Sequence, residues 1–442
     1  MYYEGGQVFR RINADGKAAF DLFMSSGLYD KLKSKGLVVS HEEVSVGGDL
    51  ARGAYKVIKP ELVPFISYPY EWSFSQLKDA ALATLVIQKQ AIENGMVLRD
   101  ASAYNIQFID GQPRLIDTLS FDAYTAGEPW TAYRQFCQHF LAPLVLMSQV
   151  DPALLSLLRV YIDGIPLPLA AKLLPLRSRF RPGLATHIHL HASFQKQHEG
   201  TAKRPAASVS RVSLLGLIDS LERTIKSLKL QISKTEWGDY YDNTNYSDAS
   251  RDEKVGITAE FVALVNPARV VDLGGNDGTY SRVATKAGSY VICADIDPIA
   301  VDANYAQVKS KKEKNLLPIL IDLTNPSPGM GWANEERASF TSRAKSDMSL
   351  ALALIHHLAI ANNLPLGMVA AYFAKLAPHL VIEFVPKSDS QVKRLLATRE
   401  DIFPHYTVEG FEAAFSDFFD IVETRPVTGS DRLMYLMKRK KN

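Results

Sequence analysis

The C-terminal half of the chain alternates short apolar runs with helical segments. The apolar runs ARVVDLGG, SYVICADID, LLPILID, MSLALALIHH and HLVIEFV each carry Gly, Asp, His or Glu at or near their ends. The segments between them include YSRVATKAG and LGMVAAYFAKLAP, which have the composition of helices. Buried strands separated by helices are typical of a parallel sheet covered on both faces, so a doubly wound, Rossmann-like α/β domain is predicted. Ligands of such sheets lie beyond the carboxyl ends of the strands, where the polar residues stand.

The N-terminal half has a different pattern of apolar and polar positions. The segment PFISYPYEWSFSQLKDAALATLVIQKQAIENGM predicts a short hinge followed by a long helix. Further along, NIQFID and PRLIDT flank the dipeptide GQ, which predicts two short strands joined in a hairpin. This half is therefore expected to be an α+β domain.

A polar stretch separates the two halves. Residues Gln195–Ser213 are rich in small and basic residues, which is typical of an exposed linker. Apolar residues then recur at a helical period, which predicts an amphipathic helix near 214–233. Its apolar stripe would pack on a flanking domain or pair with a second copy of the chain in a homodimer. The predicted division of the chain is 1–197, 198–234 and 235–442.

Composition and charge restrict the class of protein. The chain has 442 residues, of which 47% are hydrophobic and 22% charged, which is typical of a globular protein with more than one domain. Its net charge of +2 gives no bulk electrostatic argument for nucleic acid or an anionic membrane as a partner. Two cysteines, Cys137 and Cys293, are too few for a disulfide framework and indicate a reducing compartment. No apolar run is long enough to span a membrane, so a cytoplasmic enzyme without a transmembrane segment is expected.

A glycine-rich turn follows the first strand of the C-terminal half. In VVDLGGNDG, Asp272 closes the strand and the glycines let the backbone turn sharply beside a ligand. The spacing differs from G-x-G-x-x-G, and its acidic groups would repel a pyrophosphate, so a dinucleotide is not expected. Asp295 closes the second strand, where it suits ribose hydroxyls. Asp322 closes the third strand, where it suits an adenine amino group.

These strand ends resemble those of the class I S-adenosylmethionine-dependent methyltransferases. The resemblance covers about Trp237 to Lys440 and rests on VVDLGGNDG, ADIDP and LALALIHHL. It implies that Asp272 and the glycine loop bind the amino-acid part of S-adenosylmethionine, Asp295 the ribose and Asp322 the adenine. The cofactor-binding residues that it implies are Trp237, Tyr241, Asp272, Gly274, Gly275, Asn276, Gly278, Asp295, Ile296, Asp322 and Leu323.

Three residues are candidates for catalysis. His356 and His357 end the fourth strand, beside the expected place of the methyl group, and either imidazole would act as a base toward the acceptor. Alternatively, one histidine packs under the cofactor and the other shapes the pocket. Glu383 closes the fifth strand and would bind the acceptor, act as a base, or serve as a carboxylate at a helix N-terminus. The aromatic segment EWGDYYDNTNYS, before the first strand, would cover the cofactor or simply pack.

A second motif lies in the N-terminal half. Asp100 and Asn105 stand in D-x-x-x-x-N, and Asp117 follows after the predicted hairpin. Phosphoryl transfer needs a carboxylate near the attacking hydroxyl and oxygen ligands for Mg²⁺ on the phosphates of ATP. Asp100 would take the first role, with Asn105 and Asp117 as metal ligands. The arrangement resembles the catalytic lobe of protein-kinase-like and aminoglycoside-phosphotransferase-like enzymes.

The kinase-like motif departs from its family in several places. Leu98 replaces the usual histidine, Asp117 is followed by Thr-Leu rather than Phe-Gly, and no G-x-G-x-x-G loop lies upstream. The resemblance therefore implies a truncated upper lobe. A degenerate scaffold, an active phosphotransferase and a chance likeness all remain open. The residues that would replace the usual lysine of the upper lobe are Arg10, Arg11, Lys56 and Lys59.

Two further clusters of residues do not predict a binding site. His187, His189 and His191 alternate in THIHLHAS and would bind zinc only on a strand, whereas a helical context is predicted and no metal site is expected. The basic run RSRFRPG indicates a solvated surface or an interdomain contact rather than a phosphate site.

The whole chain resembles a bacterial family described as class I methyltransferases and likened to a nodulation protein. The resemblance implies methyl transfer from S-adenosylmethionine to a small-molecule or glycan-linked acceptor. One alternative is a bifunctional kinase–methyltransferase of surface glycans. Another is a pseudokinase module that recruits the acceptor. No nucleic-acid partner is expected.

Overall fold

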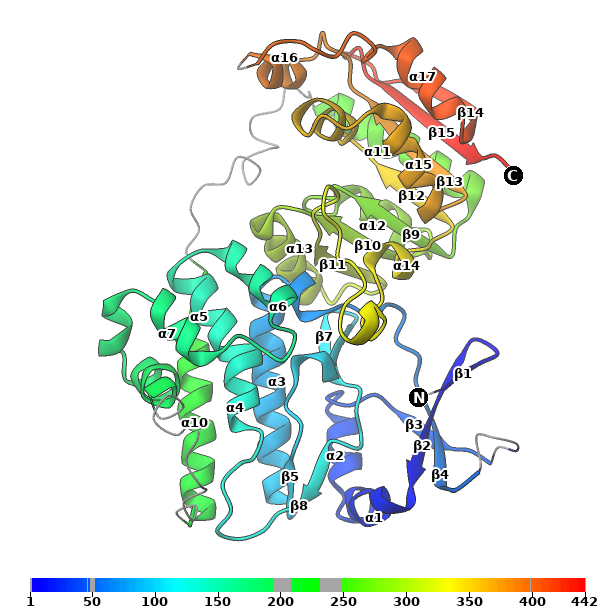
Figure 1. Cartoon of the computed structure of the whole chain (residues 1–442). Coiled ribbons are helices and arrows are strands. Elements are labelled where there is room, and N and C mark those ends of the chain that lie inside the picture. Colours follow the sequence, from blue (N-terminus) through cyan, green and yellow to red (C-terminus); the bar gives the residue numbers. More distant parts are fainter. Residues whose placement is uncertain are drawn as a thin grey trace. The chain divides into compact units, whose positions relative to one another are not determined.

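The computed structural model describes residues 2–45, 47, 52–193, 208–230, 248–397 and 399–441 (Figure 1). The chain forms two compact units, Met1–Gln231 and Ile232–Asn442. The described helix of the predicted 198–234 segment belongs to the first unit, and the predicted boundaries at 197/198 and 234/235 stay predictions. Within the described residues, no helix is both long enough and apolar enough to cross a membrane.

The second unit is built on one seven-stranded sheet. Parallel pairing joins its first five strands, and the last strand of the chain enters antiparallel beside the fifth. The order across the sheet is β11-β10-β9-β12-β13-β15-β14. The strands are β9 (Arg269–Leu273), β10 (Tyr290–Asp295), β11 (Leu316–Leu320), β12 (Met348–Ala351), β13 (His379–Phe384), β14 (Phe419–Pro426) and β15 (Leu433–Arg439).

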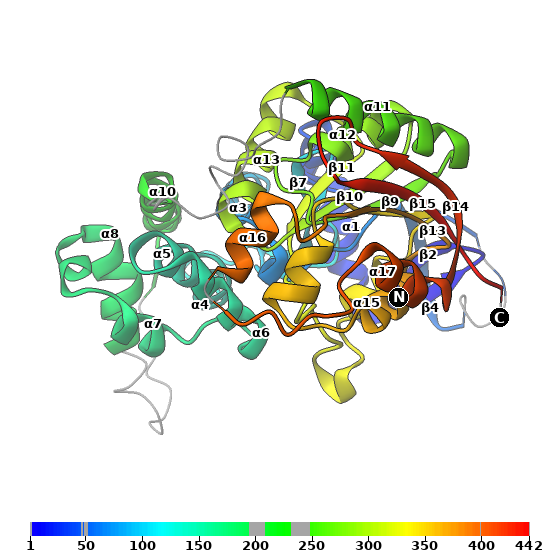
Figure 2. The same ribbon diagram turned by 90° about the horizontal axis from the view of Figure 1, so that it is seen from above.

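Helices cover both faces of this sheet. Figure 2 shows α11, α12 and α13 on one face and α15 and α17 on the other. Each strand of the parallel part is a continuous buried run, as in VVDL of β9 and VICAD of β10, because both faces are covered. The predicted doubly wound α/β sheet is thus confirmed. The helical elements are α11 (Asp248–Val265), α12 (Thr279–Lys286), α13 (Pro298–Lys311), η9 (Trp332–Asn334), α14 (Phe340–Arg343), η10 (His357–Ala361), α15 (Leu366–Leu376), α16 (Ser390–Leu396) and α17 (Val408–Ser416).

The described residues of the first unit form three small sheets. A four-stranded sheet has the order β1-β2-β4-β3, and two-stranded sheets pair β5 with β8 and β6 with β7. The β6–β7 pair is the hairpin that the sequence predicts around GQ, with Ile106 opposite Leu115. The strands are β1 (Tyr2–Glu4), β2 (Gln7–Asn13), β3 (His41–Glu43), β4 (Ala54–Pro60), β5 (Met96–Leu98), β6 (Ile106–Ile109), β7 (Gln112–Leu115) and β8 (Phe121–Ala123).

The long helix predicted before the hairpin is α3 (Phe74–Glu93). Ser73 caps it by accepting a hydrogen bond from the backbone N–H of Gln76, whose side chain in turn accepts from the Ser73 N–H. Other α-helices among the described residues of this unit are α1 (Lys17–Ser25), α2 (Leu28–Ser34), α4 (Tyr133–Phe136), α5 (Ala142–Gln149), α6 (Leu157–Val160), α7 (Leu167–Leu173), α8 (Pro182–Leu184) and α10 (Arg211–Ser227).

Helix α10 is the predicted amphipathic helix, and its stripe is covered by its own chain. It packs on α3 and α8, and the stripe residues are fully buried. Lys89 of α3 forms an ion pair with Asp219 at 2.6 Å, which adds a polar contact at the edge of the interface. Of the two predicted alternatives, packing of the stripe on a flanking domain is the one that the structure shows, and the homodimer stays a prediction. The buried stripe residues are Leu214, Ile218, Leu221 and Ile225.

Candidate functional site

The glycine loop after β9 presses directly on β10. Gly274 and Gly278 have φ of +72° and +77°, a conformation that L side chains rarely adopt. A Cβ on Gly275 would stand 2.4 Å from the Sγ of Cys293, and one on Gly278 would stand 2.6 Å from Nδ2 of Asn304. The loop therefore requires glycine at these three positions.

Asp295 is held by backbone donors at the end of β10. The N–H of Asn276, in the glycine loop, donates to Oδ2 at 2.8 Å, and the N–H of Asp297 donates to Oδ1 at 2.9 Å. Burial raises the pKa of the Asp295 carboxyl, while these two hydrogen bonds favour its ionised form. Each oxygen has a second lone pair, so the carboxylate is oriented and can still accept a pair of hydroxyl groups.

Asp272 is buried at the end of β9. Ser281, in the first turn of α12, donates a hydrogen bond to its Oδ2 at 2.6 Å. Burial raises the pKa of the Asp272 carboxyl to about 7, and the neighbouring Asp295 charge acts in the same direction. Ser281 was not predicted, because nothing in the sequence of a helical serine indicates which carboxylate it will contact.

The remaining predicted cofactor residues of the second unit lie at neighbouring strand ends. The Asp322 carboxylate accepts from the N–H and hydroxyl of Thr324 at 2.8 and 2.6 Å, which fixes its orientation after β11. Ile296 directly follows Asp295 and is more than half exposed, and Leu323 is partly buried. Ile296 is thus an exposed apolar side chain next to Asp295, the carboxylate predicted to bind ribose, and this position suits contact with one face of a flat ring. Trp237 and Tyr241 lie outside the described residues.

His356 and His357 lie where β12 gives way to the π-helix η10. Their ring centroids are 4.0 Å apart. His356 is fully buried, and both its ring nitrogens lack a hydrogen-bond partner among the described residues. Burial lowers the pKa of His356 well below its usual value and that of His357 to about 4. Both imidazoles are therefore neutral near pH 7, and His357 is the more accessible of the two.

Glu383 stands in a buried charge network. Lys254 of α11 donates to its Oε2 at 2.5 Å, and Arg432 forms an ion pair with its Oε1 at 3.3 Å. Oε2 also accepts from the N–H of Ala353 at 2.6 Å, and Ala353 has a φ of +51°. The carboxylate thereby stabilises a strained turn just before the histidines. With both oxygens engaged, Glu383 is better suited to holding this turn than to accepting a proton.

Lys254 and Arg432, the two cations of this network, were not predicted either. They come from α11 and from the connection between β14 and β15, far from Glu383 along the chain. Burial lowers the pKa of the Lys254 ammonium, and the Glu383 carboxylate opposes that shift. Arg432 also forms an ion pair with Asp389 at 2.8 Å. Neither cation belongs to a local motif, so no sequence signal was available.

The kinase-like residues of the first unit lie on loops that the strands draw together. The N–H of Ile116 donates to the carbonyl of Asn105 at 2.8 Å, which places Asn105 beside the residue before Asp117. Ser120 accepts hydrogen bonds from both sides of the motif. Its carbonyl accepts from the N–H of Arg99, the residue before Asp100, at 2.8 Å. Its hydroxyl accepts from Nδ2 of Asn105 at 3.4 Å.

Asp100 and Asp117 already have protein partners. Gln135 donates to Oδ1 of Asp100 at 2.8 Å, and Arg10 of β2 donates to Oδ1 of Asp117 at 2.5 Å. Among the four candidate cations, Arg10 is therefore the one whose contact with Asp117 is established. Arg11 instead donates to Asn13 at 3.0 Å. The other two pair within the sheet, Lys56 with Glu43 and Lys59 with Glu42.

The alternating histidines do not share a site. His187 contacts the hydroxyls of Tyr133 and Ser220 at 2.7 and 2.9 Å, and His189 contacts the hydroxyl of Ser178 at 2.7 Å. They lie on helical backbone, as the sequence predicts, and tie together segments of the first unit. Across the described part of the chain, no group of three metal-ligating side chains is found.

The second unit has the fold of the class I S-adenosylmethionine-dependent methyltransferases. Its strand order, its antiparallel β15 and its glycine loop between β9 and α12 together define that class. No family model matches the chain. The chain is 38% identical over 448 residues to the nodulation protein NoeA of Rhizobium meliloti (strain 1021), in a match that covers 98% of this chain and 94% of that protein. It belongs to the NoeA family.

Solved structures of similar fold match about half of the chain. N-methyltransferase NodS from Bradyrhizobium japonicum WM9, in complex with S-adenosyl-L-homocysteine, is 10% identical, with a TM-score of 0.35 over 47% of this chain and 94% of NodS. Magnesium protoporphyrin IX methyltransferase from Synechocystis PCC 6803 is 17% identical, with a TM-score of 0.33 over 46% and 93%. The bifunctional kinase–methyltransferase WbdD is 12% identical, with a TM-score of 0.32 over 45% and 42%.

Proposed function

We propose that the second unit transfers a methyl group from S-adenosylmethionine to a small-molecule or glycan-linked acceptor. The observation that carries this proposal is the Asp295 carboxylate, fixed by the N–H of Asn276 in the glycine loop. The Asp295 carboxylate is buried and oriented by backbone donors, which suits it to the hydroxyl groups of a ribose. The neighbouring glycine loop leaves no room for a Cβ atom, which suits it to the close approach of an unbranched chain such as the amino-acid part of the cofactor. The residues present therefore fit this cofactor.

The chain's own residues divide the work of binding. Asp295 accepts the ribose hydroxyls, and Asp322 and Ile296 hold the adenine by a polar and an apolar contact. Asp272, when ionised, attracts the cationic end of the amino-acid part. The cofactor supplies a methyl group on a positively charged sulfur, so the protein must mainly align the acceptor and keep water away.

We propose His357 as the residue that takes the proton from the acceptor, with His356 beneath it. Partial exposure lets His357 meet an acceptor, whereas His356 is sealed. A neutral imidazole is the form that accepts a proton, and burial keeps His357 neutral near pH 7. We assign Glu383 to positioning, since it holds the turn at Ala353.

Titration of the purified chain with S-adenosylmethionine and S-adenosylhomocysteine in a calorimeter tests the proposal. Binding of either compound with about 1:1 stoichiometry is expected, and Asp295→Ala should weaken it. Asp417→Ala, which removes an exposed carboxylate from the end of α17, is the matched control. Absence of binding to the intact, folded chain would refute the assignment of the site.

For the first unit, we propose a kinase-like module that binds an acceptor or a nucleotide and transfers phosphate poorly or not at all. The contact between Arg10 and Asp117 favours this over an active phosphotransferase. A Mg²⁺ ion at Asp117 would compete with a guanidinium for the same oxygen. The short β1–β2 connection, Gly5-Gly6, also leaves little backbone to hold phosphates.

A further inference from the structure

A stretch of the first unit carries positive charge without any negative charge. Residues 164–198 contain no Asp or Glu, although the chain as a whole is nearly neutral. The described part of this stretch, 164–193, includes Lys172, Arg177, Arg179 and Arg181, all of them exposed. Among the described residues, none of these four forms a salt bridge, whereas cations elsewhere in the unit, such as Lys56 and Lys89, do.

Large apolar side chains stand among these cations. Leu176 is 73% exposed and Phe180 is 86% exposed. They are the first and last residues of the 3₁₀ helix η7 (Leu176–Phe180), and Arg177 and Arg179 lie between them. Single exposed apolar residues are common, but two so exposed within five residues, interleaved with arginines, are not explained by packing. We call the exposed side chains of residues 172–181, together with Leu190, the basic–apolar face.

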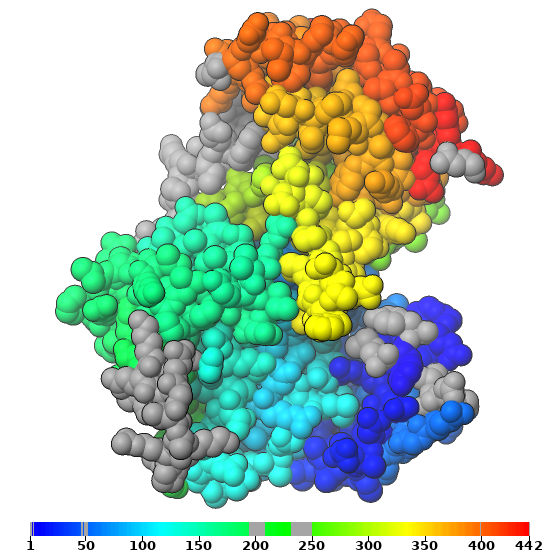
Figure 3. Space-filling model, in the orientation of Figure 1, coloured from blue at the N-terminus to red at the C-terminus, as the bar shows by residue number. Residues whose placement is uncertain are grey.

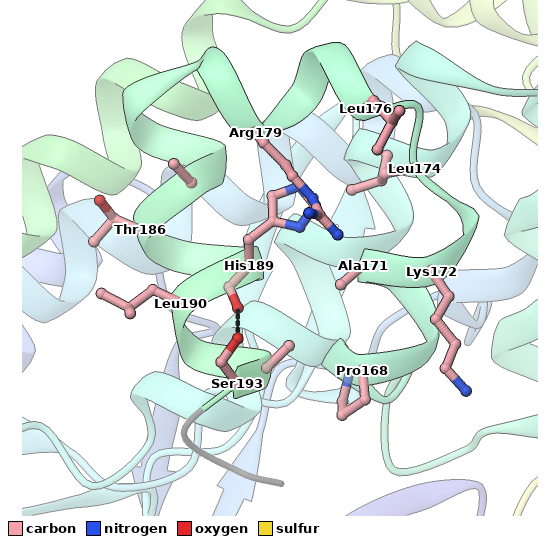
Figure 4. A pocket seen from close by; sticks show the side chains of 12 residues that line it. Pro168, Ala171, Lys172, Leu174, Leu176, Arg179, Thr186, His189, Leu190 and Ser193 are labelled. Carbon is pink, nitrogen blue, oxygen red and sulfur yellow. Dashed lines mark hydrogen bonds between the residues drawn. The ribbon is translucent and has the colours of Figure 1, made fainter. Parts of the chain in front are cut away.

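A groove opens beside this face. It has a volume of about 650 Å³ and lies between α7, η7 and the π-helix η8 (Ala185–Leu190). Its lining includes Ala171, Leu174, Leu176 and Leu190, and Figure 4 shows Lys172 and Arg179 around it. The hydrogen bond between Ser178 and His189 ties η7 to η8, so the face rests on a fixed support.

In the space-filling view this part of the first unit, in green, lies on the surface (Figure 3). Leu176 and Phe180 are largely exposed, and Leu176 also lines the open groove. A protein partner would need a matching depression for each of them. The interfacial region of a bilayer accepts protruding apolar side chains anywhere along its plane, and anionic headgroups are complementary to the surrounding cations.

We propose that the basic–apolar face binds the surface of a bilayer that contains anionic phospholipids. Arg177, Arg179 and Arg181 contact lipid phosphates, and Phe180 and Leu176 enter the interface between headgroups and acyl chains. The groove beside them accommodates part of an acyl chain. The chain is thereby held on the membrane surface without spanning it. This inference does not depend on methyl transfer by the second unit.

Co-sedimentation of the full chain with lipid vesicles tests the charge requirement. Binding is expected to phosphatidylcholine vesicles that contain phosphatidylserine, and not to phosphatidylcholine alone. Each cation near an anionic surface strengthens binding about fivefold, so R177Q/R179Q/R181Q should bind about a hundredfold more weakly. The matched control is K309Q/K311Q/K314Q, which removes three exposed cations from the second unit and should bind as the unaltered chain does.

A second pair of variants tests the apolar requirement. Phe180→Ser should weaken binding about tenfold or more, because a buried phenyl ring contributes strongly to transfer out of water. Trp332→Ser removes an equally exposed aromatic ring of the second unit and should change nothing. Because all the altered side chains are exposed, each variant is expected to fold. Thermal unfolding of each variant checks this.

Several outcomes would overturn the proposal. One is failure of the folded chain to bind anionic vesicles at low salt. Another is equal binding to neutral and anionic vesicles, which would remove the role of the arginines. A third is undiminished binding by both R177Q/R179Q/R181Q and Phe180→Ser, which would place the membrane contact elsewhere. Capture of the chain by polyglutamate but not by vesicles would identify the face as a site for an acidic protein.

Discussion

Arg10 of β2 donates a hydrogen bond from Nη1 to Oδ1 of Asp117 across 2.5 Å, with about a fifth of each side chain exposed. The same nitrogen also donates to the carbonyl of Ile116 at 3.2 Å. The contact joins the four-stranded sheet to the loop that follows the β6–β7 hairpin. The permanently charged guanidinium of Arg10 thus occupies the carboxylate that a phosphotransferase would need as a ligand for Mg²⁺.

The first prediction is that Mg²⁺-dependent phosphorylation by the chain is slow or absent. The guanidinium of Arg10 competes with the metal at Asp117, and the sequence before α3 contains no G-x-G-x-x-G phosphate loop. Asp117→Ala should leave methyl transfer largely intact. Transfer of labelled phosphate from ATP, followed with and without the acceptor, is the measurement. Rapid phosphorylation that Asp100→Ala abolishes would establish an active kinase and contradict the prediction.

The second prediction concerns cofactor binding. Asp295→Ala should weaken binding of S-adenosylmethionine tenfold to a hundredfold, because a charge-assisted hydrogen bond contributes about 1.5–3 kcal/mol. Calorimetry on the folded variant measures the change, with Asp417→Ala as the control. Unchanged affinity would remove Asp295 from the site.

The third prediction separates catalysis from packing at the histidines. His357→Ala should lower kcat about a hundredfold or more while cofactor affinity stays nearly level, because a base acts on the acceptor and not on the cofactor. The same comparison on His356→Ala should show the smaller effect on kcat. Steady-state kinetics and calorimetry on the same preparations provide both quantities. Parallel loss of rate and cofactor affinity would mean that the rings support the adenosine instead.

The fourth prediction follows from the pKa of Asp272, which burial raises to about 7. Below that pH the carboxyl is protonated and loses its attraction for a cation; above it, the carboxylate is charged. Affinity for S-adenosylmethionine should therefore increase as the pH rises through about 7. Asp272→Asn, which cannot ionise, should bind more weakly and lose this pH dependence. A wild-type affinity that stays constant across neutral pH would count against an ionisable role for Asp272.

The fifth prediction concerns the network around Glu383. Lys254→Met should lower the free energy of unfolding by about 3–5 kcal/mol, because it leaves a fully buried carboxylate with one cation fewer. Urea denaturation measures the loss. Arg425→Ala, which removes one member of an exposed ion pair with Glu423, should leave the midpoint nearly unchanged. Equal midpoints for the two variants would mean that the buried pair contributes no more than a surface one.

Local pattern alone determined the elements and much of the candidate cofactor site. Continuous apolar runs predict strands buried on both faces, and parallel strands must end at one edge of a sheet. The positions of Asp272, Asp295 and Asp322 at consecutive strand ends therefore follow from the sequence. The glycine turn follows as well, since the backbone can approach β10 only where no Cβ intervenes.

Choices between equivalent residues depended on tertiary structure. The sequence offers Arg10, Arg11, Lys56 and Lys59 as possible partners for the kinase-like loop, and only the pairing of β2 with β4 and the course of the loop after β7 direct Arg10 to Asp117. A strand period specifies the face on which a side chain lies. It does not specify what stands opposite, because that neighbour comes from another part of the chain.

The same reason explains what the sequence left open. An apolar stripe at helical spacing requires a cover, and its sequence is equally compatible with α3 or with a second copy of the chain. In the structure α10 packs on α3. Glu383 could be identified as the end of a strand, but its charge is balanced by Lys254 and Arg432, which lie 129 and 49 residues away along the chain. Local periodicity thus determined where the helices and strands form, and long-range contacts decided which charges meet, because burial requires a partner for each buried charge without prescribing its place in the sequence.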